Sequence, residues 1–455
     1  MNKNHVTAAE AFLSNKEGAQ WHNETLWGTR VKRDNLVKGI PEWEELRELA
    51  SKIKMHSITH LDHYLLQFAD AAEKNGATVH WAKDDTEHND IVLEILRKNN
   101  AEKVVKSKSM LTEECHLDDF LIENGIDVIE SDLGERILQL LKQPPSHIVM
   151  PAIHLKRQII GELFEEKLNT EKGNSDPTYL TGCMRENLRK EFLSTKVAMT
   201  GANFGVAETG DIVVCTNEGN ADMGTSQADI HIVSMGIEKV IPNRESLGVF
   251  TRLLARSATG QPITSYTSHY CKPRKGGELH IILVDNGRSD ILGNKDHLQT
   301  LKCIRCGACM NTCPVYRRSG GYSYSYFIPG PIGINLGMLK APQVYYTNLP
   351  ACTLCFSCNN VCPVKIDLGN QIYKWRQGLD AIGKANPAKK VLSGGMSFLF
   401  NHPGLFQSAL KMAPIVNKIP RSLKYNKFNE WGIGRELPEF APESFTSWWK
   451  KNVKR

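Results

Sequence analysis

Hydrophobic positions follow two different periods over much of the chain. Leu61, Leu65, Phe68 and Ala72 recur at helical spacing, and Gly76 then supplies a helix stop. Beyond this helix, short apolar runs of strand length alternate with longer amphipathic stretches. The predicted strands are 77–82, 103–107, 126–130, 147–150, 197–199, 211–216, 229–234 and 279–285, and the predicted helices are 90–98, 113–123, 135–141, 154–168 and 182–194. Strands that alternate with helices are typical of parallel βαβ units.

This pattern and its breaks divide the chain into four segments. Residues 51–298 are predicted to form one α/β domain, and residues 1–50, polar and rich in tryptophan, an extended lead-in with short helices. Residues 299–380 are predicted to form a mainly α-helical domain, because Gly and Pro in its middle argue against a long regular element. Prolines recur through residues 381–455, so an irregular tail of short helices is predicted there. Its Trp448–Trp449 pair is expected to pack back on the helical domain, with anchoring to a partner as the alternative.

One cysteine pattern occurs twice in the helical domain. Residues 303–314 and 352–363 both read C-x2-C-x2-C-x3-C-P, the spacing of two-cluster ferredoxins of the bacterial type. In this pattern the first three cysteines hold one cluster and the fourth serves the neighbouring cluster. The sequence therefore predicts two [4Fe-4S] clusters. The ligands of the first are Cys303, Cys306, Cys309 and Cys362, and those of the second are Cys352, Cys355, Cys358 and Cys313.

Other uses of cysteine fit this spacing less well. Structural zinc sites use separated C-x2-C pairs around one tetrahedral ion, without a third cysteine at the same short step. Disulfides between residues so close in sequence would be strained. The four remaining cysteines have no spacing partner and are predicted to be small buried hydrophobes; they are Cys115, Cys183, Cys215 and Cys271.

Charge is distributed unevenly. The chain has a net charge of +6, yet residues 371–455 carry 15 Lys and Arg against 5 Asp and Glu. Such a tail can dock on an acidic partner, on an anionic membrane surface, or on the acidic body of its own chain. No nucleic-acid-binding motif accompanies it. Residues 1–10 lack an apolar signal segment, and no run approaches the ~18 apolar residues of a spanning helix. We expect a cytoplasmic protein, with peripheral contact at the inner face of the membrane as a possibility.

A glycine-rich stretch at residues 201–211 is the second candidate site. Gly201, Gly205 and Gly210 would let backbone N–H groups approach a ligand, and Glu208 could act there as an acid, a base or a ligand. The polar residues 217–222 could form a second wall. The alternative is that the glycines form tight turns and Glu208 is a solvated or capping carboxylate. The stretch matches no nucleotide-binding motif, and the sequence contains no metal-binding pair of histidines and no nucleophile elbow.

Several short sequences carry a resemblance to a known family. They are 205–210 (GVAETG), the two cysteine motifs, 316–321 (YRRSGG), 329–333 (PGPIG), 435–438 (RELP) and the Trp pair at 448–449. In this order, over nearly the whole chain, they resemble lactate utilisation protein B. The resemblance implies an iron-sulfur subunit of a bacterial system that oxidises L-lactate to pyruvate. It also implies two companions, which are a second cysteine-rich iron-sulfur protein and a smaller protein made of the same α/β domain.

The resemblance further implies an α/β fold similar to ribose-phosphate isomerases and coenzyme A transferases. A glutamate is the nucleophile in the transferases, and Glu208 is its candidate counterpart. Fold likeness alone does not transfer that chemistry. The first hypothesis is therefore an electron-transfer subunit that passes lactate electrons to an unknown acceptor. The alternatives are an enzyme with its own substrate pocket near Glu208, and a redox-sensing or scaffold iron-sulfur protein.

Overall fold

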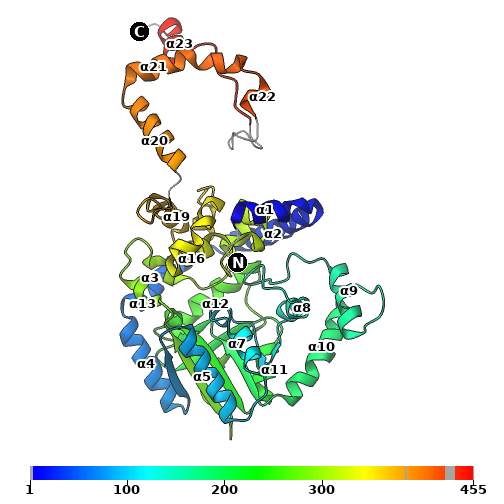
Figure 1. The fold of residues 1–455 in the computed structure, drawn as a ribbon. Helices are drawn as coiled ribbons and strands as arrows, with labels where there is room; N and C mark the ends of the chain where they lie inside the picture. Colours follow the sequence, from blue (N-terminus) through cyan, green and yellow to red (C-terminus); the bar gives the residue numbers. More distant parts are fainter. Residues whose placement is uncertain (1–3, 385–386, 426–435, 454–455) are drawn as a thin grey trace. The chain divides into compact units, whose positions relative to one another are not determined.

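The structure is a computed structural model that describes residues 4–384, 387–425 and 436–453. It divides into two compact units, Met1–Leu379 and Asp380–Arg455 (Figure 1). The first unit contains every strand among these residues, together with both cysteine motifs. Each unit is treated by itself below.

A six-stranded parallel sheet forms the centre of the first unit (Figure 1). Its strands, in chain order, are β1 (Thr78–Ala82), β2 (Lys103–Lys106), β3 (Asp127–Glu130), β4 (Val197–Gly201), β7 (Ile230–Gly236) and β10 (Glu278–Val284). Their order in the sheet is β1-β10-β7-β4-β2-β3, and every neighbouring pair is parallel. The parallel α/β sheet predicted from the sequence is confirmed.

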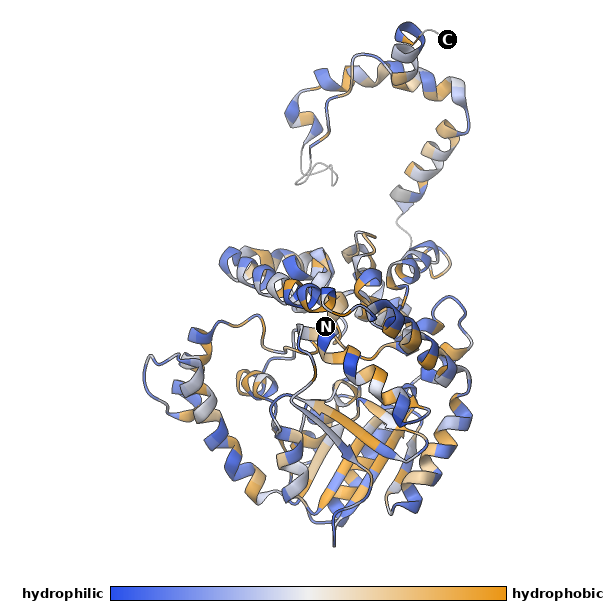
Figure 2. Cartoon of the chain, turned by 180° about the vertical axis from the view of Figure 1, so that it is seen from behind, coloured by the Kyte–Doolittle hydropathy of each residue, from blue (hydrophilic) through white to orange (hydrophobic). Residues whose placement is uncertain are grey.

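Successive residues of these strands pack on opposite faces of the sheet, as the pleat requires. Val104 packs with helices α5 (Asp85–Lys98), α6 (Met110–Glu114) and α7 (Leu117–Glu123), whereas Val105 packs with α8 (Leu133–Leu141), α9 (Arg157–Leu168) and α10 (Pro177–Ser194). Helix α4 (Leu61–Lys74) buries Leu61, Leu65 and Phe68 near Val233. Both faces are thus covered, which explains why the inner strands β4, β7 and β10 are hydrophobic at most positions (Figure 2).

A second, four-stranded sheet was only partly predicted. Its strands β5 (Phe204–Val206), β6 (Asp211–Thr216), β8 (Val240–Ile241) and β9 (Tyr266–Tyr270) take the order β8-β5-β6-β9. Only β6 was expected, because β5 and β8 are too short to show a period. Helices α11 (Asn220–Gln227), α12 (Arg244–Thr259) and α13 (Arg288–Leu292) were also missed. The predicted helix 113–123 is in fact α6 and α7, which are separated by His116 at φ +51°.

Two further sequence predictions were wrong. The first 50 residues are not an extended lead-in, because they form α1 (His5–Ser14), α2 (Lys16–Lys38) and the start of α3 (Trp43–Thr59). Residues 147–150 form no strand. His147 Nδ1 accepts the backbone N–H groups of Val149 and Met150, which a neighbouring strand would otherwise bind.

The cysteine-rich part is mainly helical, as predicted. Its helices are α14 (Ala308–Thr312), α15 (Pro314–Ser319), α16 (Gly330–Lys340), α17 (Pro342–Tyr345), α18 (Ser357–Val361) and α19 (Leu368–Gln377). Helix α16, with 11 residues, lies where a long regular element was not expected.

Short 3₁₀ turns occur at Ile237–Lys239, Leu298–Lys302, Gly321–Ser323 and Tyr346–Ala351, with another at Ala413–Lys418 in the second unit.

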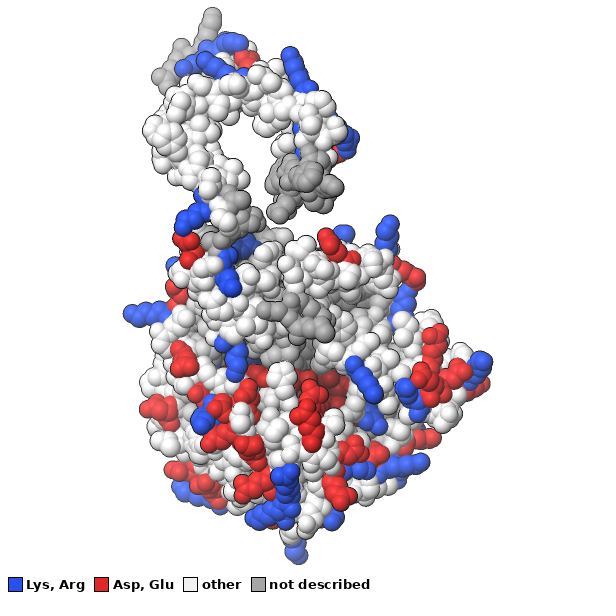
Figure 3. Space-filling view, viewed as in Figure 1, with Lys and Arg blue, Asp and Glu red and all other residues white. Residues whose placement is uncertain are grey.

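The second unit consists of short helices, in line with the predicted irregular tail. They are α20 (Pro387–Phe400), α21 (Pro403–Met412), α22 (Arg421–Lys424) and α23 (Phe445–Asn452). Lys and Arg predominate over Asp and Glu on its described surface (Figure 3). Where the Trp448–Trp449 pair packs stays a prediction. Part of the 435–438 motif lies outside the described residues. Among the described residues, no helix is long and apolar enough to cross a membrane.

Candidate metal centre and adjoining cavity

The two cysteine motifs share one backbone geometry. Arg305 and Leu354 occupy equivalent positions and have φ of +58° and +55°. The next turn in each motif is also left-handed, at Gly307 (φ +75°) and Phe356 (φ +57°). This coil aims a backbone N–H at the first sulfur of each motif: Arg305 N lies 3.4 Å from the sulfur of Cys303, and Leu354 N lies 3.3 Å from that of Cys352. The repeat seen in the sequence is therefore a structural repeat.

The fourth cysteine of each motif lies with the other motif. Cys303, Cys306, Cys309 and Cys362 line one small cavity of about 20 Å³ with apolar neighbours. Cys313 in turn lies near the second motif. Beyond the effect of burial, the charges of Cys352 and Cys355 raise the pKa of Cys313, and the charge of Cys313 raises the pKa of Cys358. Helices α14 and α18 pack against each other between the two groups. The structure thus places Cys362 with the first three cysteines of the first motif, and Cys313 near the second motif.

These thiols resist ionisation without a cationic partner. Burial, followed by the charges of neighbouring cysteines, raises the pKa of Cys306 and of Cys309 well above the usual range. Burial raises the pKa of Cys313 to about 11. A cluster core of iron supplies positive charge and binds thiolates. A set of four convergent soft donors in an apolar setting therefore suits an iron-sulfur cluster.

The N-terminal helices hold the second cysteine loop from outside. Arg47 on α3 is buried and donates to the backbone oxygen of Cys362 from Nε (3.0 Å) and Nη2 (2.8 Å). Its Nη2 also lies 3.4 Å from the oxygen of Asn359. On α2, His22 Nδ1 is 2.8 Å from the oxygen of Arg317. The segment expected to be a lead-in therefore belongs to the cysteine-rich core.

A buried histidine connects the first cysteine loop to the α/β part. His147 Nδ1 is an acceptor, so Nε2 carries the proton and donates to Asn311 Oδ1 at 3.0 Å. The amide of Asn311 donates to the oxygen of Ala258 at 2.8 Å. Burial lowers the pKa of His147 to about 3, which keeps the ring neutral. Helix α14, which carries Cys309, is fixed to α12 by this chain of bonds.

A larger cavity of about 250 Å³ opens at the carboxyl ends of the parallel strands. Ser107 follows β2, Asp132 follows β3, Gly201 ends β4 and Gly236 ends β7, and all four line it. The chain runs outward from β2 to β3, then returns to the other side of β2 to form β4. The cavity therefore lies at a topological switch point, where open α/β sheets bind ligands. Its opposite wall contains Arg305 and Cys306.

Most charged groups in this cavity are paired. Arg288 is buried and bridges Glu114 (2.9 Å) and Glu238 (2.5 Å). Lys108 Nζ lies 3.4 Å from Asp132. Burial, followed by the charge of Asp132, raises the pKa of the lining residue Glu218 to about 7.

Two cations of the cavity wall are not paired. Within the described part of the chain, the side chains of Lys239 and Arg305 make no hydrogen bond or ion pair. Burial lowers the pKa of Lys239 to about 8. Sequence reasoning missed both residues, because the end of β7 and the cysteine loop meet only in the folded chain.

Comparisons with known proteins agree with this division. A sequence model described as the LUD domain matches residues 65–291, and one described as the 4Fe-4S dicluster domain matches residues 299–366. "Lactate utilization protein B" of Bacillus cytotoxicus is 42% identical over 92% of this chain and 92% of that protein. The chain belongs to this family. "Uncharacterized electron transport protein YkgF" of Escherichia coli is 40% identical over 93% of this chain and 91% of its own length.

A solved structure shows a weaker likeness. The crystal structure of a DUF162 family protein from Deinococcus radiodurans covers 49% of this chain and 98% of its own chain, at 16% identity. Its TM-score of 0.28 is too low to support a fold assignment.

Glu208 lies outside the cavity of the LUD domain. Its side chain is exposed, and its Oε2 accepts the backbone N–H of Arg244 at 3.2 Å, at the start of α12. Gly205 and Gly210 serve close packing, since a Cβ at 205 would meet Met235 at 2.7 Å and one at 210 would overlap the backbone of Ala72. This is the capping alternative considered above, and a catalytic role for Glu208 stays a prediction. Of the expected walls, Gly201 and residues 217, 218 and 220 do line the cavity.

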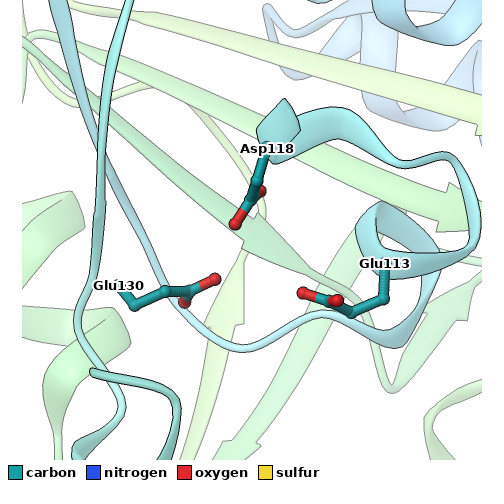
Figure 4. A group of neighbouring side chains, drawn as sticks. All are labelled: Glu113, Asp118 and Glu130. Carbon is teal, nitrogen blue, oxygen red and sulfur yellow. The ribbon is translucent and has the colours of Figure 1, made fainter. Parts of the chain in front are cut away.

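A group of three carboxylates in the LUD domain surrounds one buried lysine. Glu113, Asp118 and Glu130 point toward one another in Figure 4. The Lys106 ammonium, fully buried, lies 2.6 Å from Glu130, 3.1 Å from Asp118 and 3.6 Å from Glu113. The three carboxylates therefore form an ion-pair network around the lysine, and burial raises the pKa of Glu113 and of Glu130.

Proposed function

We propose that this chain is the iron-sulfur electron-transfer subunit of a bacterial system that oxidises L-lactate to pyruvate. The proposal rests chiefly on one observation, the position of Cys362 in one cavity with the first three cysteines of the first motif. The names of the relatives, which mention lactate utilization and electron transport, support it. Two [4Fe-4S] clusters are proposed. Cys303, Cys306, Cys309 and Cys362 hold one, and Cys352, Cys355, Cys358 and Cys313 hold the other.

The protein's own part is to hold the sulfurs and keep water away. Backbone N–H groups point at the sulfur of Cys313 from Tyr316 (3.5 Å) and at that of Cys362 from Ile366 (3.3 Å). Such bonds stabilise negative charge on sulfur and raise a cluster's reduction potential. Apolar side chains around Cys306 and Cys309 exclude solvent. When bound, the clusters supply one-electron transfer.

Lactate oxidation releases two electrons, so other components are needed. We propose that a second cysteine-rich iron-sulfur protein and a smaller LUD-domain protein complete the system, with an acceptor still to be identified. The LUD part is proposed to share the fold of ribose-phosphate isomerases and coenzyme A transferases. The basic second unit is proposed to dock on an acidic partner or on the cytoplasmic face of the membrane.

The test is anaerobic purification followed by iron and sulfide analysis and electron paramagnetic resonance. The proposal expects about eight irons per chain and two paramagnetic species on reduction. A Cys271→Ser variant is the control and should keep the full iron content, since this cysteine lies outside both motifs. Lactate should reduce the centres only when the companion proteins are added. Four or fewer irons after full reconstitution would refute the proposal, and so would lactate oxidation that continues at full rate after cluster loss.

A further inference from the structure

The 250 Å³ cavity of the LUD domain has a size that restricts its ligand. The volume of about 250 Å³ lies just below the range of about 300–1,000 Å³ that is typical of sites for drug-sized ligands. A ligand of a few heavy atoms fits this space.

The charges of the cavity favour an anion. Four of the described acidic residues line the cavity. Glu114 and Glu238 are both bound to Arg288, and Asp132 faces Lys108. Glu218, whose pKa is raised by burial to about 7, is the fourth. Lys239 follows Glu238 in a single 3₁₀ turn, yet that carboxylate points to Arg288. Lys239 and Arg305 are partly exposed and their side chains have no bonded partner among the described residues, so their charges can attract an anion that enters the cavity.

The remaining walls favour a ligand with a carbon skeleton. Met110, Ile148, Val149, Val214 and Leu254 contribute apolar surface. A bare inorganic anion would leave this surface against water, whereas a short organic acid covers it while its charged end meets the cations.

We propose that this cavity binds a small carboxylate, held by Lys239 and Arg305, with Cys306 in the wall beside it. Three independent features converge on it: the switch-point position, the unpaired cations and the restricted volume. The inference rests on the proposed function in one respect, namely that Cys306 carries a cluster. It adds a substrate-binding role to the LUD domain, at a place that puts the ligand next to the metal centre.

The test uses the full chain with both clusters loaded under anaerobic conditions. Isothermal titration calorimetry with L-lactate and with pyruvate should give a dissociation constant near or below about 1 mM. Lactamide, which has the same shape but no charge, should bind at least about tenfold more weakly. Carboxylate binding should also perturb the paramagnetic signal of the cluster assigned to Cys306 and leave the other signal unchanged.

Variants separate binding from cluster assembly. Lys239→Gln should weaken carboxylate binding at least about tenfold, and Lys239→Arg should restore it, because the charge is kept. Lys275→Gln, at an exposed lysine, is the matched control and should bind as the unaltered chain does. Iron analysis of each variant reports on the clusters independently. Lys239→Gln should keep the full iron content, and loss of iron would count against the inference because the lysine would then serve the cluster.

Three outcomes would overturn the inference while the proposed function stands. One is a chain with both clusters loaded that binds neither L-lactate nor pyruvate at concentrations up to tenfold the expected dissociation constant. Another is unchanged carboxylate affinity in both Lys239→Gln and Arg305→Gln, which would mean that these cations serve only the cluster. A third is inorganic phosphate that binds more tightly than either carboxylate.

Discussion

Replacement of Arg47 by methionine tests how the N-terminal helices hold the second cysteine loop. Arg47 is 7% exposed, and its guanidinium donates twice to the oxygen of Cys362, at 2.8 and 3.0 Å. Hydrogen bonds from charged groups contribute about 1.5–3 kcal/mol each. Without Arg47 the carbonyl keeps one donor, the backbone N–H of Lys365 at 3.2 Å. The ion pair with Glu44 adds little, because that carboxylate is 65% exposed. We therefore expect Arg47→Met to lower the free energy of unfolding by about 3–5 kcal/mol.

The assay is anaerobic urea denaturation, followed by circular dichroism and by the visible absorbance of the clusters. Arg189→Met, at an exposed arginine of α10, is the control and should change stability by less than about 0.5 kcal/mol. Cluster absorbance should be lost at lower urea in Arg47→Met than in the control. A loss of stability below about 1 kcal/mol, with unchanged cluster retention, would refute the view that α3 clamps the loop.

Two further predictions concern stability. Lys106→Met leaves three carboxylates facing one another, so it should lower the free energy of unfolding by about 3–5 kcal/mol at pH 7 in urea denaturation. Because burial raises the pKa of Glu113 and Glu130, this loss should shrink at lower pH. An unchanged midpoint of urea denaturation would contradict this account. Burial lowers the pKa of His231 to about 3. The neutral ring therefore contributes its full stability above the pKa of about 6.5 that histidine has in the unfolded chain. As the pH drops toward 3, the free energy of unfolding falls by up to ~1.4 kcal/mol per pH unit. A His231→Gln variant should show a shallower acid slope, and an identical slope would be evidence against a buried neutral ring.

The strands of the parallel sheet could be predicted because each strand is visible in a short stretch of the sequence. Val104 and Val105 lie in a short apolar run between helices, and burial on both faces makes such a run easy to recognise. Residues 147–150 also look like a strand, but His147 takes the N–H groups that would join a sheet. Whether these N–H groups bind the ring or a neighbouring strand depends on the position of the His147 side chain in the folded chain. The periodicity of apolar residues does not reveal that position.

The N-terminal helices were missed for a related reason. The buried face of α2 includes His22 and Arg33 as well as Leu26, so a search for apolar periodicity does not find it. These polar residues are buried because backbone oxygens of the cysteine loops accept their hydrogen bonds. The eight motif cysteines were found from spacing alone, since a cluster requires ligands at fixed short steps. The cavity beside them was not, because it joins strand ends and a loop that are distant in sequence.

The exchange of ligands between the two motifs is the central claim, and electron paramagnetic resonance of single Cys→Ser variants tests it most directly. Cys306→Ser and Cys355→Ser first assign one signal to each cluster. The account predicts that Cys362→Ser changes the signal assigned by Cys306→Ser, and that Cys313→Ser changes the one assigned by Cys355→Ser. If Cys362→Ser instead alters the signal assigned by Cys355→Ser, each motif binds its own cluster and the account is contradicted.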